Sequence, residues 1–326
     1  MKRMAIFLGF ISLLTACRQV KHDPRPLLLT RYDRELATYL QTTDTASEHD
    51  FLDRHHLFHA LYLSEILALS PDDPSAKTKL ALRLSQPDMR MLGQSVDSCY
   101  AETHDIETGL SQAFTRYKRL LPDDMLPTQL YGHVSGLQQQ IVNVDTLLSI
   151  SLDHYLGADF APYRAIFNPY QLPRKSREYI VPDVVRVILY TRHPFVGDSP
   201  STLLQELVYE GKIIYCLQQI LPDTPIERLM GYSPKEMQWC RENESRMWNR
   251  LLQEKNLYAT DRFLIGQYLS PAPFTAPFTQ ESPGQAGRYV GWRIVSEYMR
   301  QSRSDLPALW RENNALNILK TAKYRG

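Results

Sequence analysis

The C-terminal half of this chain is a succession of segments whose apolar residues recur with helical spacing. Several of these segments have a proline at or near the first turn, where its missing backbone N–H removes no intrahelical hydrogen bond. The pattern therefore predicts that the C-terminal half is built from helices, with at most a small sheet elsewhere. The predicted helices cover residues 182–190, 200–221, 234–254, 287–301 and 306–320.

The N-terminal half is predicted to add more helices and one small sheet. Helical spacing recurs at 33–40, 51–69 and 101–121. Short segments rich in Leu, Ile, Tyr and Thr, bounded by polar or glycine breaks, predict strands; they are 27–30, 128–133 and 146–152. We therefore predict an α+β fold, predominantly helical, in which helices pack a small β-sheet within a single domain over 27–326.

The first seventeen residues have the layout of a bacterial lipoprotein signal peptide. A basic start precedes an apolar run from Met4 to Leu14, and Thr15-Ala16 then places small residues before Cys17. The apolar run is shorter than the roughly 20 residues of a membrane-spanning helix. We predict cleavage before Cys17, lipidation of Cys17 with fatty acids such as palmitate, and a polar tether over 18–26. An ordinary secretory signal with a chance cysteine is the alternative.

The residues after Cys17 bear on where the lipid anchor stays. Arg18 stands where an aspartate often marks retention in the inner membrane, and residues 19–23 are not an acidic run of the kind associated with surface export. We therefore expect a lipid-anchored protein of the outer membrane that faces the periplasm. The periplasmic side of the inner membrane is the alternative.

Charge, cysteine content and missing motifs narrow the functional classes. The chain has 37 Lys and Arg against 36 Asp and Glu, so it lacks the basic field that nucleic-acid binding requires. With Cys17 lipidated, Cys99, Cys216 and Cys240 allow at most one disulfide, and the sequence leaves the pairing open. No CxxC, HExxH, GxSxG, Walker A or GxGxxG motif occurs. Neither structural zinc nor a common hydrolase or nucleotide site is therefore predicted, and we expect no cofactor.

The segment 203–217 is the most unusual in the chain. Glu206 and Glu210 lie one turn apart on one face of the predicted helix. Like charges at this spacing repel by roughly a few tenths of a kcal/mol unless a positively charged partner pairs with them. Gly211 costs about 1 kcal/mol relative to alanine in a helix interior, which indicates that another element packs closely there. Two interpretations remain open: the carboxylates face a cleft, or they pair with Arg or Lys of a neighbouring helix.

Two other polar groups carry weaker indications of a site. His55 and His59 lie four residues apart, as zinc-binding histidines can, but no glutamate follows His55 and a solvated helix is the simpler interpretation. Asp153-His154 follows a predicted strand and is most simply a polar pair at the strand end.

Two C-terminal segments indicate close packing. Glu244 and Trp248 share one face of a predicted helix, which favours an ion pair buried beneath the tryptophan. Gly291 beside Trp292 predicts a helix start that lies against the core or a ligand. The prolines of 271–278 disfavour helical geometry and predict an extended strap.

Several ordered segments together resemble one known family. They are Cys17, 151–157, 203–215, Tyr232, 239–244, Trp248, 272–274, 282–284, 291–295, 298–299 and 323–324. In their residues and their order along the chain they resemble the gliding-motility-associated lipoprotein family GldB, found in gliding Gram-negative bacteria and their non-gliding relatives. The resemblance is best from about residue 140 to the C-terminus.

The resemblance implies a membrane-anchored envelope component of the gliding motility and type IX secretion apparatus, without established enzyme activity. The family is similar in outline to gluzincin-type zinc peptidases, which carry HExxH on one helix and a third ligand in a Glu-Gly-x-Ala segment on a later helix. Residues 210–213 could correspond to that later segment. The segment 182–190 offers neither histidine nor glutamate, so a degenerate peptidase fold without its metal ligands is expected.

We therefore predict a non-catalytic lipoprotein whose partners are the membrane, through its anchor, and other envelope proteins. A partner-binding cleft is expected around Glu206, Glu210, Lys212, Glu244 and Trp292. The alternative is an unusual metal-dependent or carboxylate-based hydrolase that uses Glu206 and Glu210 with His154 or His193. A glycan-binding module is a third possibility, based only on the abundance of tyrosine and the predicted location in the cell envelope.

Overall fold

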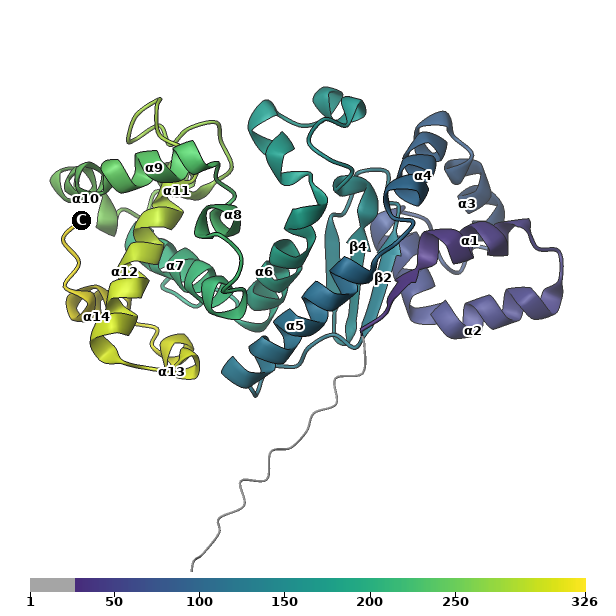
Figure 1. Ribbon diagram of the computed structural model, residues 1–326, viewed down its shortest axis with the longest axis horizontal. Coiled ribbons are helices and arrows are strands. Elements are labelled where there is room, and N and C mark those ends of the chain that lie inside the picture. The colour runs from purple at the N-terminus through teal and green to yellow at the C-terminus, as the bar shows by residue number, and fades with distance from the viewer. Residues whose placement is uncertain (1–26) are drawn as a thin grey trace, which may run out of the picture.

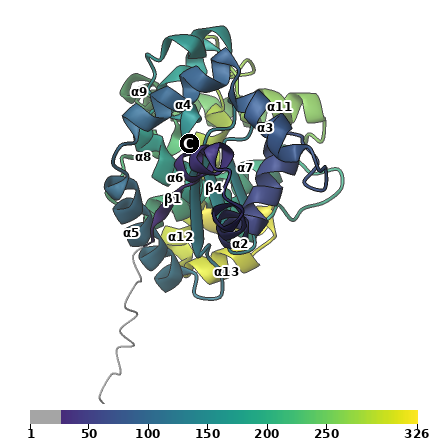
Figure 2. The ribbon, with the colours of Figure 1, turned by 90° about the vertical axis from the view of Figure 1, so that its right-hand side faces the viewer.

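A computed structural model describes residues 27–326 of the chain (Figure 1). The predicted signal peptide, the lipidation site Cys17 and the tether 18–26 lie outside the described residues. In Figure 1 the sheet stands to the right of the middle, α1 to α4 lie on its right, and the C-terminal helices fill the left half. Figure 2 looks along this direction from the right and places α1 and α2 in front of the sheet.

One four-stranded mixed sheet occupies the described part of the chain, in the order β1-β2-β4-β3. β1 (Leu29–Arg31), β2 (Gln129–His133) and β4 (Leu147–Ser151) are parallel and lie where strands are predicted. β3 (Ile141–Val144), antiparallel to β4, is not among the predicted strands. A two-residue turn, with Asp145 at φ +49°, joins β3 to β4. It lacks the Asn-Gly or Asp-Gly pair that marks such turns in sequence.

Alternate residues of the strands face two separate clusters of buried side chains. Leu130 and Leu148 point into the larger cluster, which continues into the C-terminal helices. Their neighbours in the chain, Tyr131 and Leu147, point into the smaller cluster beneath α1, α2 and α3. Because successive side chains of a strand point to opposite faces, this small sheet is buried on both sides.

The helices of the N-terminal half are α1 (Tyr32–Gln41), α2 (Thr45–Leu61), α3 (Ala76–Leu84), α4 (Pro87–Cys99) and α5 (His104–Leu120). α2 begins before the predicted 51 because the Asp44 carboxylate accepts the Ser47 backbone N–H at 2.9 Å and caps the helix. It continues as a π-helical turn, Tyr62–Ile66. α3 and α4 are absent from the prediction, and α4 contains Gly93, which lowers its helix propensity.

The C-terminal half consists of helices, as predicted. They are α6 (Ile180–Arg192), α7 (Leu203–Ile220), α8 (Ile226–Met230), α9 (Pro234–Glu242), α10 (Glu244–Gln253), α11 (Arg262–Leu269), α12 (Ala286–Ser302), α13 (Leu306–Arg311) and α14 (Ala315–Ala322). The predicted helix 234–254 is two helices that meet at Asn243, and 306–320 is also two. Residues 271–278 form no helix or strand, which agrees with the predicted strap.

Helices α7 and α12 cross at two glycines. A Cβ atom on Gly211 would lie 2.2 Å from the backbone oxygen of Gly291, and one on Gly291 would lie 1.8 Å from the backbone oxygen of Leu207. Neither distance is possible between real atoms, so only glycine permits this approach. The close packing predicted at Gly211 is confirmed, and what Gly291 and Trp292 lie against is the protein core.

All three cysteines of the described residues are free thiols. Cys99 is exposed, whereas Cys216 and Cys240 are buried. Burial raises the pKa of the Cys216 thiol to about 12 and also raises that of Cys240, so both stay protonated and unreactive near neutral pH.

A thiol reagent should therefore label one cysteine in the folded protein spanning residues 18–326. We expect modification at Cys99 alone under native conditions and at all three thiols in denaturant, because only Cys99 reaches solvent. Mass spectrometry of peptides from both samples measures this. Native labelling of Cys216 would contradict its position in the core.

No helix within residues 27–326 has the length and apolar character needed to cross a membrane.

Candidate functional site

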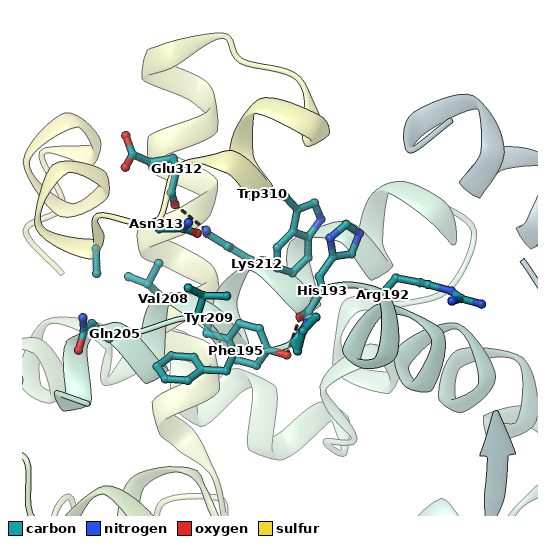
Figure 3. A pocket seen from close by; sticks show the side chains of 13 residues that line it. Arg192, His193, Phe195, Gln205, Val208, Tyr209, Lys212, Trp310, Glu312 and Asn313 are labelled. Atoms are coloured by element: carbon teal, nitrogen blue, oxygen red, sulfur yellow. Dashed lines mark hydrogen bonds between the residues drawn. The ribbon is translucent and has the colours of Figure 1, made fainter. Parts of the chain in front are cut away.

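A cavity of about 230 Å³ lies beside α7, at the side that faces the loop after α6 and the segment after α13 (Figure 3). We call it the Lys212 pocket. It brings together His193, Phe195 and Val196 from the loop after α6, Tyr209 and Lys212 from α7, Trp310 from α13 and Glu312 from the segment that follows it. Of the residues predicted for a cleft, Lys212 is the one that lines it.

Lys212 is a nearly buried amine, with 5% of its surface exposed. Its Nζ donates to the backbone oxygen of Glu312 at 2.7 Å and lies 5.6 Å from the centre of the Trp310 ring (Figure 3). Within residues 27–326, no carboxylate lies within 4 Å of this Nζ. Burial lowers the pKa of the amine from 10.5 to about 8, because a low-dielectric environment disfavours the charged form.

The walls of the pocket are held by their own contacts. The His193 ring stacks on Trp310 with centroids 4.2 Å apart and planes 5° apart. His193 Nε2 lies 2.7 Å from the Asp124 carboxylate, and Tyr209 donates its hydroxyl to the His193 backbone oxygen at 2.8 Å. A site with walls fixed in this way is formed before any ligand arrives.

The pocket lining includes two solvent-exposed apolar side chains, which we call its mouth, beside polar side chains such as Asn313. Val196 is 64% exposed and Phe195 is 37% exposed, and both follow α6 directly. Together with the amine of Lys212 inside, this mouth can accept a segment that combines an apolar side chain with a hydrogen-bond acceptor.

Removal of the Lys212 amine should change how stability depends on pH. Below about pH 8 both the folded and unfolded states hold the proton, and the penalty for burying the charge is fully present. Between about pH 8 and 10.5 the unfolded state binds more protons, so this residue makes stability rise with pH. In Lys212→Met that rise, of order 3 kcal/mol at most, should be missing from urea unfolding curves. Parallel pH profiles of the two proteins would contradict it.

Glu206 and Glu210 pair with arginines of two different helices. Glu206 forms an ion pair with Arg262 at the start of α11. Glu210 accepts the Tyr190 hydroxyl at 2.9 Å to both oxygens and lies 2.9 Å from Arg288 Nε of α12. That N–H is not directed at the carboxylate, so charge rather than an aligned hydrogen bond holds the Arg288 contact. Of the two interpretations left open by the sequence, internal pairing with neighbouring helices is the one observed.

Glu244 is the centre of a separate group near the C-terminus. It accepts hydrogen bonds from Tyr289 at 2.7 Å, Arg293 Nε at 2.8 Å and Tyr324 at 2.9 Å. Trp248, predicted to cover this pair, packs edge-on against Tyr324. Glu244 therefore ties the C-terminal residues to α12.

Trp292 lies beside this group, with its ring against Tyr289 and Arg293, and its indole N–H donates to Gln218 of α7 at 3.1 Å. The five residues predicted for one cleft are thus distributed over four local environments. Their contacts come from different helices, which the sequence pattern alone does not relate.

The histidines noted in the sequence also have partners inside the protein. His55 lies 2.8 Å from the Glu35 carboxylate, and His59 Nδ1 lies 2.6 Å from the Tyr32 hydroxyl. His154 lies 3.0 Å from Lys175 Nζ. In the part of the chain from 27 to 326, no group of three or more His, Cys, Asp or Glu side chains is arranged to hold a metal ion.

The residues around Glu210 do not fit the zinc site of a gluzincin. The side chains that meet the Glu210 carboxylate are a tyrosine of α6 and an arginine of α12. One turn before Tyr190, α6 carries Arg186, which is buried. A guanidinium is always cationic and offers no lone pair to a metal, so these residues replace rather than supply ligands.

Much of the Lys212 pocket is not predicted from the sequence. His193 appears only in the alternative hydrolase hypothesis, and Phe195, Tyr209, Trp310 and Glu312 are not singled out. Single aromatic residues at loop and helix ends carry no periodic pattern, and their convergence depends on how three distant segments pack.

The described residues form a predominantly helical α+β protein with a small mixed sheet, and Glu206, Glu210 and Glu244 each form an ion pair with an arginine. The family model described as gliding motility protein GldB matches residues 17–326, so the chain belongs to that family and is a lipoprotein associated with gliding motility. No curated protein and no solved structure matches the chain significantly.

Proposed function

We propose that this lipoprotein is a non-catalytic, partner-binding component of the gliding motility and type IX secretion apparatus. It is held by lipidated Cys17 in the outer membrane, facing the periplasm, and binds another envelope protein. The observation that carries the proposal is the apolar mouth of the Lys212 pocket, where Phe195 and Val196 stand exposed above a buried amine. Exposed apolar side chains at the mouth of a concave site are typical of a surface that a partner covers.

The proposed absence of catalysis is supported by what holds the carboxylates. Glu206, Glu210 and Glu244 each contact an arginine, and none of them lines the Lys212 pocket. A carboxylate engaged by a guanidinium is a poor general base, because the ion pair favours its deprotonated, bound form.

Elemental analysis decides between this proposal and the metal-dependent hydrolase. The protein spanning residues 18–326 would be purified without chelator and without affinity histidines. We expect zinc far below one atom per chain. Near-stoichiometric zinc would overturn the non-catalytic proposal and place the hydrolase first.

Partner binding is tested by placing a charge at the mouth of the pocket. Cells whose own copy is replaced by the Val196→Asp variant should lose gliding or type IX secretion while keeping normal amounts of anchored protein. The matched control is Ile166→Asp, since Ile166 is 57% exposed and does not line the pocket. Equal behaviour of the two variants would contradict a role for this mouth.

A further inference from the structure

A second cavity, of about 170 Å³, lies beneath the extended strap that joins α11 to α12. We call it the strap pocket, and it shares no lining residue with the Lys212 pocket. Its walls come from the 3₁₀-helical segment Pro169–Arg174 with Lys175, from the loop after α8, and from both ends of the strap, Pro271–Pro273 and Gly284–Gln285.

Lys175 places a nearly buried positive charge in this pocket. It is 7% exposed, and its Nζ lies 3.0 Å from His154 Nδ1, 3.4 Å from the Gln140 side-chain oxygen and 4.1 Å from the centre of the Phe167 ring. Burial lowers the pKa of His154 to about 3, so that its ring is neutral. The described residues offer Nζ no carboxylate within 4 Å, and the third N–H of the ammonium has no acceptor.

One arginine lines this pocket, and two more lie near that arginine or near another lining residue. Arg174 lines the pocket and forms an ion pair with Asp183 at 3.1 Å. Arg288 contacts Gln285, a lining residue, at 3.1 Å. Arg186 is 7% exposed, and its Nε and Nη1 have no hydrogen-bond partner among residues 27–326. Burial lowers the pKa of Arg186, and the positive charges of Arg174 and Arg288 contribute in the same direction.

Within residues 27–326 Lys175 contacts no carboxylate, although several lie nearby. Asp183 pairs with Arg174 and Glu210 pairs with Arg288, whereas Glu236 is half-buried at the pocket wall. The charges of Asp183 and of the fully buried Asp153 act on Lys175 from beyond 4 Å and favour its charged form. Because these carboxylates already offset much of the positive charge, a ligand with a single negative charge suits this place better than a phosphate group, which would bring about 1.5 to 2.

We propose that the strap pocket binds a carboxylate, seated against Lys175 and Arg174. The carboxylate accepts the free N–H of the Lys175 ammonium and an N–H of the Arg174 guanidinium that Asp183 does not use. The small volume suits either a small organic acid or the terminal residue of a polypeptide that ends in a free carboxylate.

The pKa of Lys175 reports occupancy directly. It would be measured by NMR in the 18–326 protein labelled at lysine Nζ and Cε, with Lys175→Met and Lys175→Arg to assign the resonance. The probes are N-acetyl-trialanine with a free C-terminus, the same peptide as its amide, and propionate. We expect the free-acid peptide at millimolar concentration to raise the pKa of Lys175 from about 8 toward its ordinary value, because a bound anion favours the ammonium.

The probes separate the two sources of the carboxylate. An equal effect of propionate at the same concentration identifies a small acid as sufficient, whereas an effect of the peptide acid alone identifies a chain terminus. The matched control is Lys212→Met, which removes the other buried lysine and should leave the shift of Lys175 intact. An unchanged Lys175 pKa with every acid, an equal effect of the amide, or loss of the shift in Lys212→Met would overturn the proposal.

Discussion

A single methyl group added to Gly291 should remove much of this protein's free energy of unfolding. In Gly291→Ala the new Cβ would fall 1.8 Å from the backbone oxygen of Leu207, and a backbone atom within a helix cannot rotate away as a side chain can. Helices α7 and α12 would have to separate along their crossing. We expect a loss of about 3 kcal/mol or more in the free energy of unfolding, measured with urea or guanidinium.

Gly93→Ala is the matched control for this change. Gly93 lies in α4, and a Cβ built on it meets no atom within 4 Å. The same substitution there should be neutral or add up to about 1 kcal/mol, because alanine is the better helix former. Gly211→Ala should behave like Gly291→Ala, since its Cβ would meet the backbone oxygen of Gly291. Equal stability of Gly291→Ala and Gly93→Ala would contradict the close crossing.

Replacement of Glu210 by alanine should also destabilise the fold strongly. The side chains of Glu210 and Arg288 are each 14% exposed, so removal of the carboxylate leaves a largely buried guanidinium without its counter-charge. We expect a loss of about 3 kcal/mol in the free energy of unfolding. This differs from the expectation for a carboxylate that faces an open cleft, whose removal would affect binding and leave the fold intact.

Glu206→Ala provides the control on the same helix face. Its partner Arg262 is 69% exposed, so water replaces most of what the pair contributes, and the loss should stay within about 1 kcal/mol. The double variant Glu210→Leu with Arg288→Met should recover much of the stability lost in Glu210→Ala, because it removes both charges together. A Glu210→Ala protein no less stable than Glu206→Ala would show that the Glu210 pair is not a structural contact.

Local patterns account for the parts of the fold that were predicted correctly. Helix α7 was predictable because Leu203, Leu207, Ile214 and Leu217 recur with helical spacing, and all are buried. The same pattern cannot reveal an interruption of the backbone, so it predicts one helix over 234–254 although the chain turns at Asn243. Strand β3 is absent from the prediction, and its pairing with β4 depends on the turn at Asp145.

The candidate site was predictable only in fragments. Lys212 was identified from the unusual segment around Glu206 and Glu210, but the sequence placed it with Glu244 and Trp292. On α7, Lys212 faces α13, Glu210 faces α6 and α12, and Glu206 faces α11. Positions a few residues apart on a helix point in different directions, and which neighbour each one meets depends on the packing of distant segments.

Residue type and local spacing are enough to predict the helical character of the C-terminal half, the positions of three of the four strands, the close packing at Gly211 and the family. Only the packing of distant segments settles which arginine pairs with each glutamate, how His193 and Trp310 form one wall, and where Lys175 and Lys212 contact no carboxylate of the described residues. Those outcomes depend on contacts between residues far apart in the chain, and charge balance in a buried place exists only once the surrounding elements have packed.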